Sequence, residues 1–213
     1  LHARRLLDVC RKLATFPERL GDLHGQYFST VMFDETYAQR DGTIRRETRF
    51  PRDTTEWILS GPHFSVANPF HQTPRSVCET NRAYDRIDLE NLPEEFLPRT
   101  NYVPACSADE YRRRTPKVNW VADGEVDARR VTDFYRLAYR GMLPQSGERT
   151  LMPVILPPGA GHIHGVQSTS FRTTSLLLRQ AASTVGLVSD FYVKTTGRNN
   201  LMATWASLPL VPE

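Results

Sequence analysis

The chain has 213 residues with 39% hydrophobic and 10% aromatic side chains, which fits one large or two small folded domains and excludes a wholly disordered protein. Its net charge is only +3, and no apolar run approaches the roughly 20 residues that a transmembrane helix needs. There is no signal-peptide pattern, and the three cysteines are too few and too scattered for a disulfide framework or a metal cluster. We therefore expect a cytoplasmic protein that has no contact with a membrane.

The first 50 residues predict one helix and one hairpin. Residues 1–15 carry apolar side chains at helical spacing, which indicates an amphipathic helix that ends near Pro17. Asp41-Gly42 is typical of a hairpin turn, so we expect it to join two strands, in residues 35–40 and 43–50.

The next segment predicts two strands, a loop and a helix. Residues 56–60 and 63–68 have the composition of strands and are separated by a Gly-Pro pair. Residues 86–106 are rich in Pro and Asn, which indicates a long ordered loop of the kind that often carries function. Ser107 and Glu110 form a capping box, which starts a short helix through Arg114.

The last third predicts alternating helices and strands after a linker at residues 123–127. Helical spacing of apolar residues predicts a helix over 131–143, and an apolar run predicts a strand over 149–157. Residues 164–171 alternate weakly and are expected to pair beside that strand. Residues 174–185 predict a buried helix that ends at a glycine.

These elements together predict an α+β fold with a mixed β-sheet, flanking helices and long ordered loops. The linker divides the chain into an N-terminal part, residues 1–122, and a C-terminal α/β part, residues 123–213. We expect the two parts to pack together as one unit.

Asn68-Pro69-Phe70 is close to the Asn-Pro-Pro-aromatic signature of enzymes that methylate the exocyclic amine of adenine. In such a loop the Asn side chain and a backbone carbonyl hold the amine of a flipped base, and the aromatic ring stacks on it. The second proline is missing here, and residues 1–60 contain no glycine-rich turn after an apolar strand that would bind S-adenosylmethionine. We therefore expect a tight turn at residues 68–70, no bound cofactor, and no catalysis by this chain alone.

Three further motifs are incomplete. Gly159-Ala160-Gly161 resembles the start of a dinucleotide fingerprint, but His164 stands where Gly or Ala is needed. His162 and His164 could ligate a metal from one face of a strand, but no nearby acid or cysteine completes the set, and a hydrolase built around them is the weakest alternative. Lys194-Thr-Thr-Gly197 lacks the Ser-x-x-Lys partner motif of penicillin-binding enzymes.

Arginine dominates the basic residues. Of the 27 Lys and Arg residues only Lys12, Lys117 and Lys194 are lysines, which leaves 24 arginines. A guanidinium makes planar bidentate contacts with guanine edges, phosphates and carboxylates. A GC-rich genome also favours Arg over Lys, so the bias permits nucleic-acid binding without requiring it.

Four phrases of the sequence carry a family resemblance: WILSGPHFSVANPF, IDLENLPEEFLPRTNYVPA, DFYRLAYRGMLPQSGERTLMPVILPPGAGHI and LVSDFYVKTTG. Together they span roughly residues 57–197. They resemble the region after the catalytic domain in large bacterial N6-adenine DNA methyltransferases of restriction-modification type and related phage-defence systems. That region includes the target-recognition domain of those enzymes.

The sequence lacks an initiator Met, opens inside a helix-like stretch and ends abruptly at LPLVPE, so we expect an excised domain of a longer polypeptide. The resemblance implies that the catalytic methyltransferase domain of that polypeptide would lie upstream, with its S-adenosylmethionine and an intact Asn-Pro-Pro-aromatic loop. Residues 68–70 would then be a structural turn, and double-stranded DNA would be the main partner. A structural or protein-interaction module of a phage-defence complex is the alternative.

Physical reasoning then selects candidate DNA-binding residues in two polar regions, residues 99–120 and 194–200. The cations would contact phosphates, Asn side chains and Lys117 would contact base edges, and two aromatic rings would stack or wedge beside an opened base pair. A solvated helix face and core packing are the alternatives for the cluster of three arginines and for the two rings. The candidates are Arg99, Asn101, Tyr102, Arg112, Arg113, Arg114, Lys117, Asn119, Trp120, Lys194, Arg198 and Asn199.

Overall fold

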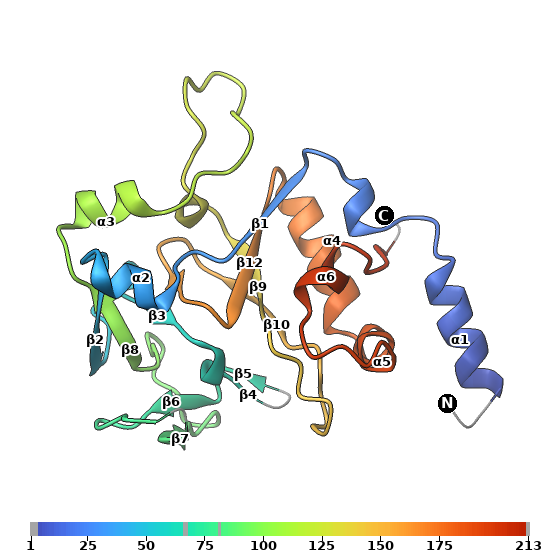
Figure 1. The fold of residues 1–213 in the computed structure, drawn as a ribbon, viewed down its shortest axis with the longest axis horizontal. Coiled ribbons are helices and arrows are strands. Elements are labelled where there is room, and N and C mark those ends of the chain that lie inside the picture. Colours follow the sequence, from blue (N-terminus) through green and yellow to red (C-terminus); the bar gives the residue numbers. More distant parts are fainter. Residues whose placement is uncertain (1–3, 66–67, 81, 212–213) are drawn as a thin grey trace.

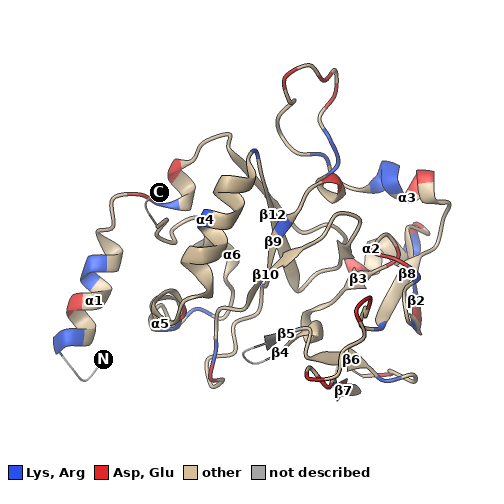
Figure 2. Cartoon of the chain, turned by 180° about the vertical axis from the view of Figure 1, so that it is seen from behind, with Lys and Arg blue, Asp and Glu red and all other residues tan. Residues whose placement is uncertain are grey.

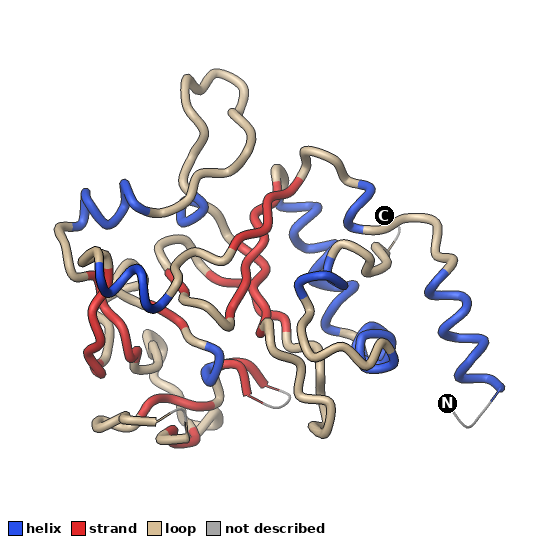
Figure 3. The backbone as a smooth tube through the Cα atoms, in the orientation of Figure 1, coloured by secondary structure: helices blue, strands red, loops and turns tan. Residues whose placement is uncertain are grey.

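The structure, a computed structural model, describes residues 4–65, 68–80 and 82–211. At its centre is a four-stranded antiparallel sheet with helices on one side and smaller two-stranded sheets on the other (Figure 1, Figure 3). This arrangement confirms the predicted α+β class. The strand order is β1 (Tyr27–Thr30), β12 (Val166–Phe171), β9 (Arg136–Arg140) and β10 (Pro153–Leu156).

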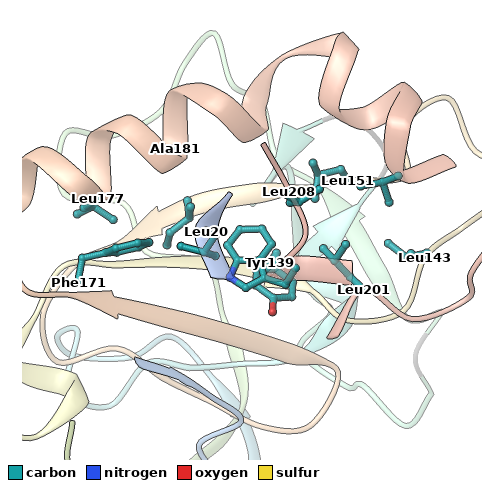
Figure 4. Packing of buried hydrophobic residues seen from close by; sticks show 12 residues of the cluster. Leu20, Tyr139, Leu143, Leu151, Phe171, Leu177, Ala181, Leu201 and Leu208 are labelled. Carbon is teal, nitrogen blue, oxygen red and sulfur yellow. The ribbon is translucent and has the colours of Figure 1, made fainter. Parts of the chain in front are cut away.

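Three helices cover one face of this sheet: α4 (Thr174–Val185), α5 (Leu187–Thr195) and α6 (Met202–Trp205). The helix predicted over residues 174–185 is confirmed. It begins where the Thr173 hydroxyl accepts a hydrogen bond from the backbone N–H of Leu176 at 3.2 Å, and it ends at Gly186. The main core lies between these helices and the sheet (Figure 4).

Strand β9 contributes side chains to two hydrophobic cores, one on each face of the central sheet. Leu137 and Tyr139 belong to the main core, where the Tyr139 ring lies 4.0 Å from that of Trp205, centroid to centroid. Ala138, which faces the other way in the strand, belongs to a second core against the small sheets. The helix predicted over 131–143 is therefore wrong. Its helical spacing arose because Leu137 and Ala138, adjacent residues buried on opposite faces of β9, combine with apolar residues outside the strand.

The remaining strands form four two-stranded sheets on the other side. They are β2 (Ile44–Arg49) with β8 (Thr100–Pro104), β3 (Ile58–Leu59) with β11 (Gly161–His162), β4 (Phe64–Ser65) with β5 (Asn68–Pro69), and β6 (Gln72–Pro74) with β7 (Tyr84–Arg86). The β3–β11 pair is parallel. The short helices are α1 (Arg4–Ala14), α2 (Glu35–Arg40) and α3 (Ala108–Arg114), with 3₁₀ turns η1 (Leu20–Asp22), η2 (Gly61–His63) and η3 (Val131–Asp133).

Two more of the predicted helices are confirmed, and the predicted hairpin is wrong. Helices α1 and α3 lie within the predicted ranges, and the Ser107 hydroxyl caps α3. Residues 35–40 form α2 because the Asp34 carboxylate accepts hydrogen bonds from two backbone N–H groups of its first turn, each at 3.0 Å. Strand β2 then pairs with the distant strand β8.

Two further predictions need correction. Residues 86–106 are not one loop, because 100–104 form the buried strand β8. The strands in residues 149–157 and 164–171 exist, but they are not neighbours, since β9 lies between them.

The predicted N-terminal part contributes β1 to the central sheet, and the predicted C-terminal part contributes its other three strands. In the described part of the chain, no helix is both long enough and apolar enough to cross a bilayer.

Gly159 follows β10 in a conformation that a side chain would strain. Its φ is +90°, and a Cβ at this position would lie 2.6 Å from Thr54 Oγ1 and 3.2 Å from the Thr54 carbonyl carbon. We expect Gly159→Ala to lower the free energy of unfolding by about 1–2 kcal/mol, measured by urea denaturation. Gly124→Ala is the matched control, because its φ is +82° and nothing lies within 4 Å. Equal losses in both variants would show that the contact with Thr54 adds nothing.

Candidate nucleic-acid interface

A groove of about 1490 Å³ lies between β2 with the turn that follows it, α3, and the loop of residues 117–130. We call it the arginine groove. Figure 2 shows basic segments on α3 and at the base of this loop, which projects from the body of the molecule. The basic side chains that line the groove are Arg45, Arg49, Arg52, Arg112, Lys117, Arg129 and Arg130.

Most of these cations pair with acidic side chains. Arg112 makes a two-pronged contact with Asp133, at 2.6 and 3.0 Å. Arg130 instead donates to the carbonyl oxygen of Thr115 at 2.6 Å. The other pairs are Arg45–Glu47, Arg49–Glu47, Arg49–Glu56, Arg52–Glu56, Lys117–Asp127 and Arg129–Glu125. The pairing fixes the guanidinium groups in place and leaves the groove with little net charge.

Glu56 holds two of these arginines on one wall. Its buried carboxylate accepts hydrogen bonds from Arg52 Nε and Arg49 Nη1, each at 2.7 Å, and from the Arg52 backbone N–H at 3.1 Å. The side-chain hydrogen bonds from Arg52 and then Arg49 lower the pKa of Glu56 to about 2. Glu56 therefore stays ionised and ties the turn after β2 to the groove wall. Sequence analysis missed this cluster.

The structure separates the predicted residues around α3 into different environments. Arg112 and Lys117 line the arginine groove. Arg113 and Arg114 both pair with Glu110 of the same helix, and Arg114 Nη1 also donates to Thr43 Oγ1 at 2.8 Å. Two further candidates follow α3: Asn119 is exposed, and Trp120 is buried with its ring 5.9 Å from that of Phe134.

Three predicted residues at or next to β8 are engaged with other side chains, two of them inside the protein and Arg99 at its surface. Asn101 is 6% exposed, and its side-chain amide donates to Tyr84 Oη at 3.0 Å and accepts from Thr48 Oγ1 at 2.9 Å. The Tyr102 hydroxyl donates to Glu35. The Arg99 guanidinium lies 4.3 Å from the centroid of the Phe50 ring. Asn101 and Tyr102 thus present no free edge or ring to a nucleic acid in this conformation.

The second predicted region follows α5 and does not join the first. Lys194 Nζ donates to the carbonyl oxygen of Gly147 at 2.7 Å, while Arg198 and Asn199 are exposed. Helix α5 lies on one side of the central sheet and α3 on the other (Figure 1, Figure 2). The two regions therefore cannot form one continuous patch around α3.

Phe70 of the Asn-Pro-Phe segment is a packing residue. Its φ is +68°, its backbone N–H donates to the His63 carbonyl at 2.8 Å, and its ring lies 5.1 Å from that of Trp57. Asn68 and Pro69 form strand β5, which pairs with β4, and residues 66–67 between the strands lie outside the described residues. The Phe70 ring contributes to the core and is not free to stack on a base.

The two histidines of the incomplete metal motif lie in different environments. His162 is fully buried, and its Nε2 lies 2.8 Å from Ser168 Oγ. Burial, followed by the charge of Arg136, lowers the pKa of His162 to about 3, so it is neutral. His164 is exposed, with its Nδ1 at 3.3 Å from an Asp34 carboxylate oxygen. Among the described residues no three His, Cys, Asp or Glu side chains gather as a metal site would require.

Comparisons with known proteins add no family. No protein-family model and no curated protein matches the chain.

Proposed function

We propose that this chain is a DNA target-recognition domain that binds duplex DNA sequence-specifically in the arginine groove. The observation that carries the proposal is the set of seven basic side chains, six of them arginines, that line one large groove. A guanidinium presents a flat fork of donors that fits both a phosphate and the O6/N7 edge of guanine. Ion pairs within the groove hold these forks in place before DNA arrives, which reduces the entropy lost on binding.

The ion pairs also predict how salt acts on binding. Each phosphate that a protein neutralises contributes about −0.9 to the slope of log affinity against log salt. Six of the seven groove cations already have a carboxylate partner. DNA bound in the groove would therefore release fewer counterions than the number of basic side chains suggests. More of the binding energy would come from contacts with base edges and from DNA shape.

The domain would work as part of a larger enzyme. It would present an adenine to a catalytic methyltransferase domain of the same polypeptide, which would bind S-adenosylmethionine. A bacterial cytoplasm is the proposed setting. Asn119 is an exposed amide that follows the groove residue Lys117 by two positions, and we propose it as a reader of adenine edges.

We expect Arg112→Ala combined with Lys117→Ala to weaken binding to every duplex by about tenfold or more, and to reduce the salt slope by less than the roughly 2 that two unpaired cations would contribute. The reason is that both side chains line the groove and extend into solvent, with 61% and 40% side-chain exposure. The measurement is fluorescence anisotropy of labelled duplexes at several salt concentrations. Arg11→Ala with Lys12→Ala on α1 is the matched control, because it removes the same charge away from the groove.

Wild-type affinity and salt slope in the groove variant would contradict the proposal. A protein-interaction module would then be the better supported function. Four apolar side chains of the helical layer favour that second candidate, since each is at least 54% exposed: Leu178, Val185, Leu187 and Val188.

A further inference from the structure

A second pocket, of about 350 Å³, lies behind the wall of the arginine groove. Successive side chains of a strand point to opposite faces, so in β2 Arg45 lines the arginine groove and Arg46 lines the second pocket. The opposite wall includes Arg140, which follows Ala138 by two positions in β9 and so shares its face. A volume of this size is that of a small-molecule site.

The two guanidinium groups in this pocket differ from those in the groove. Arg46 Nη2 donates to the carbonyl oxygens of Cys78 and Glu79, at 2.9 and 3.3 Å. Arg140 Nη1 donates to the carbonyl oxygen of Phe64 at 3.2 Å. Neither arginine pairs with a carboxylate anywhere in the part of the chain that the structure describes. A carbonyl oxygen satisfies a donor but does not compensate the positive charge.

Burial makes this lack of compensation costly for Arg140. The side chain is half-buried, and desolvation lowers the pKa of its guanidinium. One carboxylate, that of Glu35, also lines the pocket. It accepts a hydrogen bond from the Tyr102 hydroxyl, and a neutral hydroxyl does not compensate its charge. The pocket thus holds two guanidinium groups and one carboxylate, which leaves an excess of positive charge.

We propose that the second pocket binds a phosphate group between Arg46 and Arg140. A phosphate oxygen pair matches the planar donor fork of arginine, and its negative charge would compensate both cations at once. Gln72, Gly61 and Gly165 also line the pocket. The phosphate could belong to a DNA backbone or to a free nucleotide, and preferring the DNA backbone depends on the proposed function.

The first test uses inorganic phosphate alone, titrated calorimetrically into the protein at constant ionic strength maintained with chloride. We expect saturable binding to the wild-type chain, and at least about tenfold weaker binding to Arg46→Gln and to Arg140→Gln. Arg75→Gln is the matched control, because it also removes an exposed arginine but from a position that lines neither the second pocket nor the arginine groove. It should bind phosphate like the wild type.

The variants also distinguish loss of phosphate binding from loss of folding. Arg46 is exposed, so its substitution should leave the thermal melting temperature nearly unchanged. Arg140→Lys keeps the positive charge at the half-buried position and should retain part of the phosphate affinity. Phosphate binding to Arg46→Gln and Arg140→Gln that equals wild-type binding would overturn the proposal, as would absence of binding to the wild type.

The second test identifies the source of the phosphate. Anisotropy with a labelled duplex is compared with titration of a nucleoside monophosphate for the same variants. Weaker duplex binding by Arg46→Gln supports a backbone phosphate, whereas an effect on the monophosphate alone supports a free nucleotide. The inorganic-phosphate test does not involve DNA. Absence of phosphate binding in that test is therefore distinguishable from absence of DNA recognition by the arginine groove.

Discussion

We expect Asp190→Ala to lower the free energy of unfolding by about 3–5 kcal/mol. Asp190 lies in α5 and is 5% exposed, and one of its carboxylate oxygens accepts from the backbone N–H groups of Thr150 and Leu151, at 2.7 and 2.6 Å. The same oxygen lies 3.5 Å from Arg149 Nε. Truncation would leave two buried backbone donors without their acceptor and would remove the carboxylate that pairs with the Arg149 guanidinium.

Urea denaturation with a fluorescence readout measures this loss. Asp190→Asn keeps one acceptor oxygen and should lose less than the alanine variant. Asp85→Ala is the surface control, because the Arg75–Asp85 pair is more than half exposed on both sides and should contribute less than about 1 kcal/mol. A loss below about 1 kcal/mol for Asp190→Ala would show that Thr150 and Leu151 find other acceptors.

Helices could be predicted from the sequence where their signals are local. Ser107 with Glu110 starts α3, and Thr173 with Gly186 brackets α4, and each of these signals lies within a few residues of the helix that it bounds. Strands were harder to predict because their partners are distant in the sequence. Strand β9 is buried on both faces by residues of the helical layer and of the small sheets, and no local pattern contains that information.

The residues of the candidate site also divide into those that local sequence signals identify and those whose position depends on contacts with distant residues. Arg112 and Lys117 could be selected because they are cations in a polar region of the sequence, and both line the arginine groove. The groove wall with Arg49, Arg52 and Glu56 could not, since it forms when the turn between β2 and β3 folds back on itself. Asn101 was selected as a loop residue, and the pairing of β8 with β2 places it in the interior.

The stability that Glu56 contributes should depend on pH in the acid range. Its pKa falls from an ordinary value of 4.5 to about 2, first through hydrogen bonds from Arg52 and then through those from Arg49. A carboxyl group whose pKa is lower in the folded state stabilises the fold fully above its unfolded pKa. That contribution is lost as the pH falls from about 4.5 towards 2, because protonation then becomes as favourable in the folded as in the unfolded chain.

We therefore expect Glu56→Gln to lower the free energy of unfolding by roughly 2–3 kcal/mol at pH 7, and by much less at pH 3. The whole pKa shift would correspond to roughly 3.4 kcal/mol, and solvent around the exposed Arg52 side chain reduces this contribution. The measurement is urea denaturation of both proteins between pH 3 and pH 7. Arg52→Ala is the matched control, because it removes the hydrogen bonds that lower the pKa of Glu56 most but keeps the carboxylate. The acid loss should begin near the same unfolded pKa as in the wild type, but it should be smaller and should end at a higher pH. A wild-type minus Glu56→Gln difference that stays constant across this range would show that the pairing of Glu56 with its arginines does not lower its pKa.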